Sequence, residues 1–307
     1  MILHYQSHGR GEPVLILHGL FGSSRNWSVF ARKLAEQYRV ITVDLRNHGN
    51  SGHADAMAYT DMATDIRHVL EECGLDRASI IGHSMGGKVA MTFALCFGPL
   101  LGHLVILDIA PVSYNNAFRS IIESLEELPL PGLNSRKHAD ELLADKITDT
   151  SLRLFLLQNL VKVNDDFRWR VNLASVKNNL AIISGFPEFR PERYHGGPAL
   201  FLGGMQSSYL LPEHVPVINR YFSEATVDYI EDAGHWLHID QPGHNGFFRQ
   251  VDKLVILSRF CESIVDRYDL ISFNNDRHLR SGFLGFSINQ ITTMDKRFLC
   301  GPCDRND

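Results

Sequence analysis

The pentapeptide Gly82–Gly86, with the pattern G-x-S-x-G, constrains the fold of this chain more than any other feature. It follows the apolar run Ala78–Ile81 and precedes the apolar segment Lys88–Leu95, which has a helical composition. Glycines on both sides of Ser84 permit a sharp turn, because glycine tolerates backbone conformations that other residues avoid. A strand–turn–helix of this kind lifts a serine hydroxyl off the edge of a sheet, so we expect Ser84 to be a nucleophile.

Segments typical of strands and of helices alternate on both sides of this turn. The expected strands are Met1–Gln6, Pro13–Leu17, Arg39–Val43, Ala78–Ile81, Leu104–Leu107, Pro198–Leu202 and Val227–Ile230. The expected helices are Trp27–Gln37, Tyr59–Cys73, Lys88–Leu95, Leu211–Tyr221 and Gly246–Val265. This alternation predicts an α/β fold, with a mostly parallel sheet covered by helices on both faces.

Residues 112–197 break the alternation and predict a helical cap inserted after the strand that follows the turn. Apolar residues share a helix face in two runs, Leu152–Leu160 and Leu173–Ile183, and no strong strand pattern lies between them. We expect residues 1–111 and 198–265 to form the α/β core. Residues 266–307 match no clear element and are expected to be a C-terminal extension.

Length, net charge, apolar runs and cysteine content limit which partners and which compartment we expect for this chain. A chain of 307 residues can bury a large core, and its net charge of −5 gives no basic footprint for nucleic acid. No apolar run is long enough to cross a membrane, and the N-terminal residues lack the pattern of a secretory signal. Five cysteines, mostly in apolar surroundings, predict reduced thiols and a cytoplasmic location.

His235 is the histidine best placed to remove the proton from a serine hydroxyl. In a parallel sheet, reacting groups come from loops at the carboxyl ends of strands. His235 lies in such a loop, after the expected strand that ends at Ile230, and late enough for the order serine–acid–histidine. His238 is the main alternative. His18 and His48 lie in turns, where hydrogen bonds to nearby backbone explain them better.

The acid that orients this histidine follows by elimination. The loop after the strand Pro198–Leu202 contains no carboxylate before Glu213. The strand Leu104–Leu107, the first after the serine, ends directly at Asp108. We therefore expect Asp108 to orient the imidazole ring and to stabilise its positive charge, with Glu213 as the alternative.

Backbone amides are expected to bind the oxyanion that forms on a substrate carbonyl. One donor is the N–H of Met85, the residue after the nucleophile. The other comes from the loop after the strand that ends at Leu17. Leu20 is the expected donor there, and Phe21 is the alternative.

A lysine and two cysteines are also of reactive types, but we do not expect them to take part in catalysis. Lys88 lies one turn into the helix after Ser84, so packing or solvent exposure explains it better than a role as base. Cys300 and Cys303 form a C-x-x-C pair without a strand–helix setting or a second pair of ligands. We expect no metal site, no redox site and no cofactor.

Together these motifs resemble those of the α/β-hydrolase superfamily. The motifs are His18-Gly19 with Gly22, Asp44-x-Arg46-x-His48-Gly49-x-Ser51, Gly82-His83-Ser84-Met85-Gly86-Gly87 and Gly234-His235-Trp236. More narrowly, a second set is similar to bacterial YbfF-type esterases and abhydrolase-domain-11 proteins. It comprises Asn47-His48-Gly49, Lys88, Asp108-Ile109-Ala110-Pro111 and Trp169-Arg170-Val171-Asn172-Leu173. The resemblance covers residues 2–260.

The resemblance implies a serine hydrolase that cleaves short-acyl carboxylic esters, or acyl thioesters, through an acyl-enzyme beneath a helical cap. It also implies an acid after the strand that follows the serine, and a small-molecule acyl ester or thioester as partner. Haloalkane dehalogenases and epoxide hydrolases need an aspartate in place of Ser84. Carbon–carbon bond hydrolases and cofactor-free haloperoxidases keep the serine and remain alternatives, as does a non-catalytic ligand receptor on the same fold.

Overall fold

The computed structural model describes four stretches of the chain: residues 1–115, 118–189, 194 and 197–241. Two compact units divide the chain at Val255, and every described residue belongs to the first of them. The expected helix Gly246–Val265 and the expected extension 266–307, with Cys300 and Cys303, lie outside the described residues.

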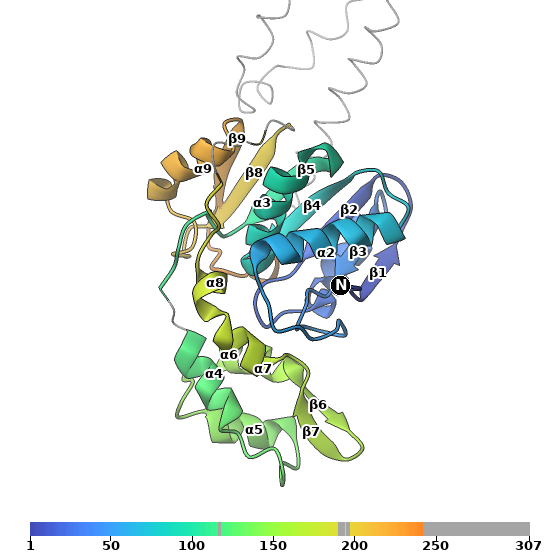
Figure 1. Cartoon of the computed structure of the whole chain (residues 1–307). Helices are drawn as coiled ribbons and strands as arrows, with labels where there is room; N and C mark the ends of the chain where they lie inside the picture. Colours follow the sequence, from blue (N-terminus) through green and yellow to red (C-terminus); the bar gives the residue numbers. More distant parts are fainter. Residues whose placement is uncertain (116–117, 190–193, 195–196, 242–307) are drawn as a thin grey trace, which may run out of the picture. The chain divides into compact units, whose positions relative to one another are not determined.

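A seven-stranded sheet forms the centre of the described residues, in the order β1-β3-β2-β4-β5-β8-β9 (Figure 1). Its strands are β1 (Tyr5–His8), β2 (Pro13–Leu17), β3 (Arg39–Val43), β4 (Ala78–His83), β5 (Leu101–Leu107), β8 (Ala199–Gly204) and β9 (Ala225–Ile230). The edge strand β1 runs antiparallel to β3, and all the other pairs are parallel. The predicted α/β class with a mostly parallel sheet is confirmed.

Side chains of the strands alternate between two hydrophobic clusters, as the two-residue period of a strand requires. In β2, Leu15 and Leu17 join the cluster of α2 and α3, whereas Val14 and Ile16 join the cluster of α1. The helices outside the insertion are α1 (Ser28–Leu34), α2 (Tyr59–Glu72), α3 (Met85–Phe97), α9 (Val215–Tyr221) and α10 (Leu237–Asp240). Helices therefore cover both faces of the sheet.

Helix α2 shows how local sequence sets an element's position and its end. Its apolar stripe at helical spacing is fully buried: Met62, Ile66, Val69 and Leu70. Gly74 ends the helix in a left-handed conformation, with φ of 64°. Its N–H donates to Glu71 O at 3.1 Å, and the N–H of Leu75 donates to Leu70 O at 2.9 Å. These two bonds form a Schellman cap.

We call the chain between β5 and β8 the cap segment. Its helices are α4 (Phe118–Glu126), α5 (Arg136–Leu143), α6 (Thr150–Leu156), α7 (Leu173–Asn178) and α8 (Leu180–Ser184). It also contains an antiparallel hairpin of β6 (Leu160–Val163) and β7 (Asp166–Trp169), visible in Figure 1. The helical insertion is as expected, but the expectation of no strand within it was wrong.

The hairpin was missed because its apolar residues fit a helix as well as a strand. Leu160 continues the helical spacing of α6, yet it begins β6 after a single 3-10 turn. The turn residues Asn164 and Asp165 both have positive φ, 48° and 69°. Such a pair matches the twist of a two-residue hairpin loop, so turn chemistry and not apolar spacing determines the element here.

Lys88 is buried in α3 and joins that helix to the cap segment at two places, shortly after β5 and at the end of α8. Its ammonium donates to Val112 O at 2.9 Å, where the cap segment begins. It also donates to Ser184 O at 2.9 Å and to Gly185 O at 2.6 Å, where α8 ends. The ammonium lies 4.7 Å from the centre of the Tyr114 ring. Of the two roles expected for Lys88, solvent exposure is excluded by its burial.

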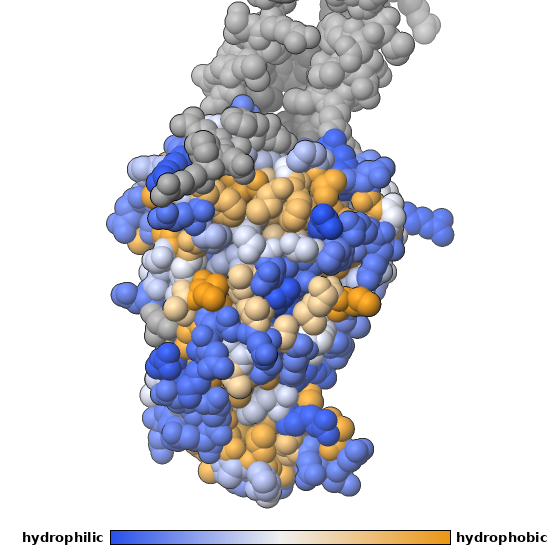
Figure 2. Space-filling view, viewed as in Figure 1, coloured by the Kyte–Doolittle hydropathy of each residue, from blue (hydrophilic) through white to orange (hydrophobic). Residues whose placement is uncertain are grey.

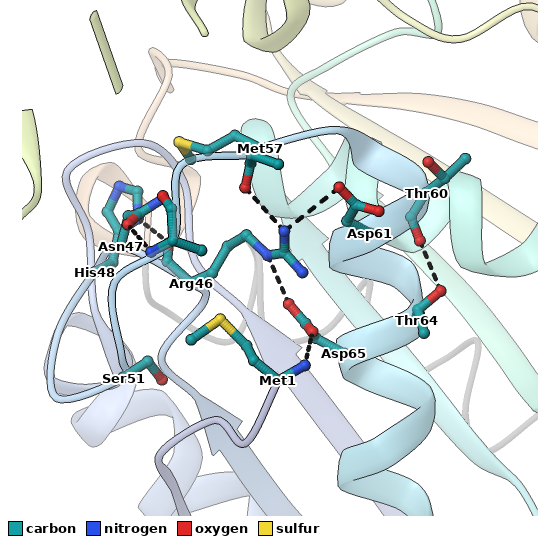
Figure 3. A network of polar contacts seen from close by, with 12 residues as sticks. Met1, Arg46, Asn47, His48, Ser51, Met57, Thr60, Asp61, Thr64 and Asp65 are labelled. Carbon is teal, nitrogen blue, oxygen red and sulfur yellow. Dashed lines mark hydrogen bonds and ion pairs between the residues drawn. The ribbon is translucent and has the colours of Figure 1, made fainter. Parts of the chain in front are cut away.

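The loop after β3 is attached to α2 by buried Arg46 (Figure 3). Its Nε lies 2.7 Å from Asp65 Oδ2, and its Nη1 lies 2.8 Å from Ala56 O and 3.5 Å from Asp61 Oδ2. The Met1 nitrogen lies 2.5 Å from the other oxygen of Asp65. These contacts hold in place the loop that carries His48.

The surface carries both hydrophilic and hydrophobic side chains, as is usual for a folded domain. Figure 2 shows hydrophilic side chains over much of the visible face of the cap segment, with hydrophobic groups between them. None of the described helices has both the length and the apolar character needed to cross a membrane.

Candidate active site

Ser84 lies in a strained turn between β4 and α3. Its φ of 53° and ψ of −119° fall outside the regions that L-residues prefer. A Cβ on Gly82 would lie 2.4 Å from Gly86 O, and a Cβ on Gly86 would lie 2.5 Å from Leu17 O. No side chain fits at either position, so both glycines are required for the turn that presents the Ser84 hydroxyl.

His235 and Asp108, 127 residues apart in the chain, are joined by a hydrogen bond of 2.6 Å between Nδ1 and Oδ2. Asp108 is fully buried after β5, and the His235 side chain is 23% exposed. A carboxylate only accepts hydrogen bonds, so Nδ1 carries the proton. The Nε2 atom of the neutral ring is then left as an acceptor, the state that a general base needs.

The loop after β8 supplies two donors to Asp108. The N–H of Gly204 donates to Oδ1 at 3.1 Å, and the hydroxyl of Ser207 donates to Oδ2. These two hydrogen bonds fix the orientation of the Asp108 carboxylate. Sequence reasoning found no acid in this loop. It missed Ser207 as a donor to Asp108, because no motif or spacing indicates that role.

Tyr209 and His83 fix the position of His235, and sequence reasoning missed both. The Tyr209 ring stacks on the imidazole, with ring centres 4.2 Å apart. Tyr114 donates its hydroxyl to Tyr209 O at 2.5 Å. His83 Nε2 lies 2.8 Å from His235 O. Burial holds the pKa of His83 well below its ordinary value, so this ring is a neutral donor that connects the turn at Ser84 to the histidine loop.

Of the two alternative residues, His238 lines the same cavity as Ser84, whereas Glu213 does not. His238 is stacked on Trp27 at 3.9 Å, and burial lowers its pKa to about 4. Glu213 is exposed in the 3-10 helix Pro212–His214. The geometry therefore favours His235 and Asp108 over these alternatives.

Geometry also distinguishes Leu20 from Phe21 as the second oxyanion donor. Gly19 O accepts from His18 Nδ1 at 2.8 Å and from Gly22 N at 2.9 Å. The peptide bond is planar and trans, so the N–H of Leu20 points away from these two donors. The N–H of Phe21 is instead engaged by His48 Nε2 at 3.2 Å. Leu20 also lines the cavity at Ser84.

His48 and the cap segment both bond to the backbone of Phe21 in this loop. Burial lowers the pKa of His48 to about 3, so the ring is neutral. Its Nδ1 lies 2.9 Å from Arg46 O, which leaves Nε2 to accept from Phe21. Buried Asn159 of the cap segment donates its Nδ2–H to Phe21 O at 2.7 Å. The cap segment therefore contacts the candidate oxyanion loop directly.

Ser84 and His235 line one small cavity of about 60 Å³. The cap segment contributes Phe118, Leu152 and Phe155 to its walls. Phe155 and Trp236 both line the cavity, and their ring centres lie 5.5 Å apart. The lining is largely apolar, which suits a hydrocarbon chain next to a reacting carbonyl.

The chain belongs to the alpha/beta hydrolase fold family, which matches residues 12–242. It is an α/β hydrolase of the esterase/lipase type, as its relatives indicate. The superfamily and subgroup resemblance seen in the sequence is confirmed.

Three relatives illustrate this similarity. The sn-1-specific diacylglycerol lipase ABHD11 of Danio rerio is 40% identical over 246 residues, covering 78% of this chain and 77% of the relative. Esterase YbfF of Escherichia coli is 32% identical, covering 77% of this chain and 91% of the relative. The solved structure of a marine microorganism esterase superposes with a TM-score of 0.76 at 37% identity, covering 78% of this chain and 95% of that one.

Proposed function

We propose that this chain is a serine hydrolase that cleaves short-acyl carboxylic esters, and acyl thioesters, through an acyl-enzyme. Ser84 is the nucleophile, His235 the general base and acid, and Asp108 the carboxylate that orients the imidazole. The observation that carries the proposal is the 2.6 Å bond from His235 to Asp108, with His235 in the same cavity as the strained Ser84.

In the proposed reaction, Nε2 of His235 accepts the hydroxyl proton as Ser84 Oγ attacks the carbonyl carbon. The oxygen of the tetrahedral intermediate accepts hydrogen bonds from the N–H groups of Met85 and Leu20, each worth about 3 kcal/mol in the transition state. The imidazolium then protonates the leaving alcohol or thiol. A water molecule, deprotonated by His235, then attacks the acyl-enzyme in the same way, and the carboxylic acid product leaves.

Several features support the finer parts of the proposal. A cavity of about 60 Å³ with aromatic walls suits a short acyl group. The proposal also includes the division of the chain: residues 1–111 and 198–265 form the α/β core, and residues 112–197 form the cap above Ser84. Cys73 is a free thiol, as a reducing compartment such as the cytoplasm favours.

The substitution Ser84→Ala tests this proposal. It should abolish hydrolysis of p-nitrophenyl butyrate and labelling by a fluorophosphonate, because no other hydroxyl occupies the turn. Ser124→Ala is the matched control, since Ser124 is half-buried in α4, lines neither described cavity, and donates its hydroxyl to Ser120 O within the same helix. Turnover by Ser84→Ala protein at the wild-type rate would disprove the assignment. Ligand-dependent thermal stabilisation of the wild type without any product would favour a receptor.

A further inference from the structure

A second cavity, which the proposed reaction does not use, adjoins the cavity at Ser84. Its volume is about 610 Å³, within the range of small-molecule sites. Phe21 and Asn26 line both cavities. Asn26 Nδ2 also donates to Gln158 Oε1 of the cap segment at 2.8 Å, so the second cavity lies where the core meets the cap segment.

The lining of this cavity is strongly basic. It contains four cationic side chains: Arg25, Arg136, Lys137 and Arg170. Among its described lining residues the one carboxylate is Asp140, which is already paired with buried Arg153 at 2.8 Å. The whole chain carries a net charge of −5, so this local excess of positive charge does not follow from composition.

These cations are available to a ligand. Within the part of the chain that the structure describes, Arg25, Arg136 and Arg170 have no carboxylate within 4.0 Å. Lys137 approaches Glu141 at 3.9 Å on the helix surface, where such pairs are weak. Arg136 donates its Nε–H to Leu160 O at 2.8 Å, which orients its guanidinium at the cavity wall.

We propose that the second cavity binds an anionic group of the substrate, a phosphate or a carboxylate, while the ester carbonyl lies at Ser84. This inference rests on the proposed function. Guanidinium groups bind such oxyanions through paired, charge-assisted hydrogen bonds. Phe21 and Asn26 line both cavities, so the two cavities are neighbours, and the proposed substrate extends past these residues from Ser84 to the basic lining.

Two matched substrate pairs test the inference and identify which end of the substrate carries the charge. The first pair is 1-butyrylglycerol and its 3-phosphate, which differ in the leaving group. The second is p-nitrophenyl butyrate and mono-p-nitrophenyl succinate, which differ in the acyl group. We expect wild-type kcat/KM to favour the anionic member of at least one pair by about tenfold or more, the effect of one charge-assisted contact.

Charge reversal at Arg25 and Arg170 together (Arg25→Glu with Arg170→Glu) should remove that preference. The control is Arg32→Glu, an exposed residue of α1 that lines neither cavity and should keep the wild-type ratio. The preference should also weaken at about 0.5 M salt, because salt screens exposed charges. Equal ratios of charged to neutral substrate in wild type and in the reversed variant, for both pairs, would overturn the inference.

A binding measurement separates this inference from the proposed reaction. Calorimetry on Ser84→Ala protein should detect both anionic esters or the preferred one, with Kd rising about tenfold after reversal of Arg25 and Arg170. If the wild type cleaves none of the four esters, the proposed reaction is disproved. Calorimetry then still tests whether the second cavity binds the anionic esters. Absence of binding, or an unchanged Kd in the reversed variant, would refute the anion site.

Discussion

At the residue scale, the candidate site depends on backbone conformations that L-residues rarely adopt. Ser84 and Asp108 each follow a parallel strand directly, and both have positive φ, 53° and 49°. Each conformation costs on the order of 1–3 kcal/mol and persists because its surroundings hold it. Ser84 N donates to Leu107 O at 3.0 Å, and Asp108 N donates to Leu202 O at 2.9 Å. The sheet itself thus stabilises both strained residues.

The substitution Asp108→Asn should lower kcat for p-nitrophenyl butyrate by about 10³–10⁴-fold. An asparagine has the same shape, but its neutral amide neither stabilises the imidazolium nor keeps the proton on Nδ1 of His235. Steady-state kinetics near neutral pH measure the effect. Glu213→Gln serves as the control, because Glu213 is exposed. A larger loss in Glu213→Gln than in Asp108→Asn would show that the wrong acid was chosen.

At the element scale, one buried ammonium fastens the cap segment to the core. Lys88 contacts the cap segment at Val112, shortly after β5, and at Ser184 and Gly185, where α8 ends. Three carbonyls and the Tyr114 ring replace the water that burial removes from the charge. Both contact points are therefore held from within α3, the helix that begins just after Ser84.

The substitution Lys88→Met should destabilise the protein by about 3 kcal/mol, because it leaves buried carbonyls without their donor. Urea unfolding followed by circular dichroism measures the change. Lys162→Met is the control, since Lys162 is exposed in β6 and its pair with Asp165 is a surface contact. Such a surface change is worth within about 0.5 kcal/mol. Equal stabilities for the two variants would argue against the fastening role.

At the scale of the whole molecule, buried histidines connect stability to pH. Burial lowers the pKa of His18, His48, His83 and His238, and that of His48 falls to about 3. The neutral forms of His18 and His48 bond to the candidate oxyanion loop, neutral His83 lies in the turn at Ser84, and neutral His238 stacks on Trp27. The folded state therefore resists protonation that the unfolded chain accepts below about pH 6.5.

The free energy of unfolding should accordingly fall as the pH drops from about 6.5 toward 3, because the unfolded chain binds more protons in that window. His48 alone accounts for about 2 kcal/mol at pH 5. Urea unfolding at pH 7 and pH 5 measures the loss. His48→Gln keeps an acceptor for Phe21 N–H but does not titrate, so it should lose less. An equal loss in wild type and variant would contradict this account.

Local sequence patterns predicted the architecture well. The six parallel strands and helix α2 were expected within a few residues of their ends, because burial imposes a period on apolar residues. The first strand was expected at Met1–Gln6, whereas β1 begins at Tyr5. It begins there because Tyr5 is the first residue that pairs with β3. The hairpin β6–β7 was missed because short apolar runs suit either element.

The sequence by itself determined the α/β class, the sharp turn at Ser84 and a short set of candidates for base, acid and oxyanion donors. These follow from properties that a few neighbouring residues carry, such as apolar period and the freedom of glycine. Tertiary structure alone decided that His235 meets Asp108, that Ser207 and His83 support them, and that Phe21 N–H is engaged by His48. Each of these contacts joins residues 27 or more positions apart, where geometry depends on the packing of the whole sheet and not on local spacing.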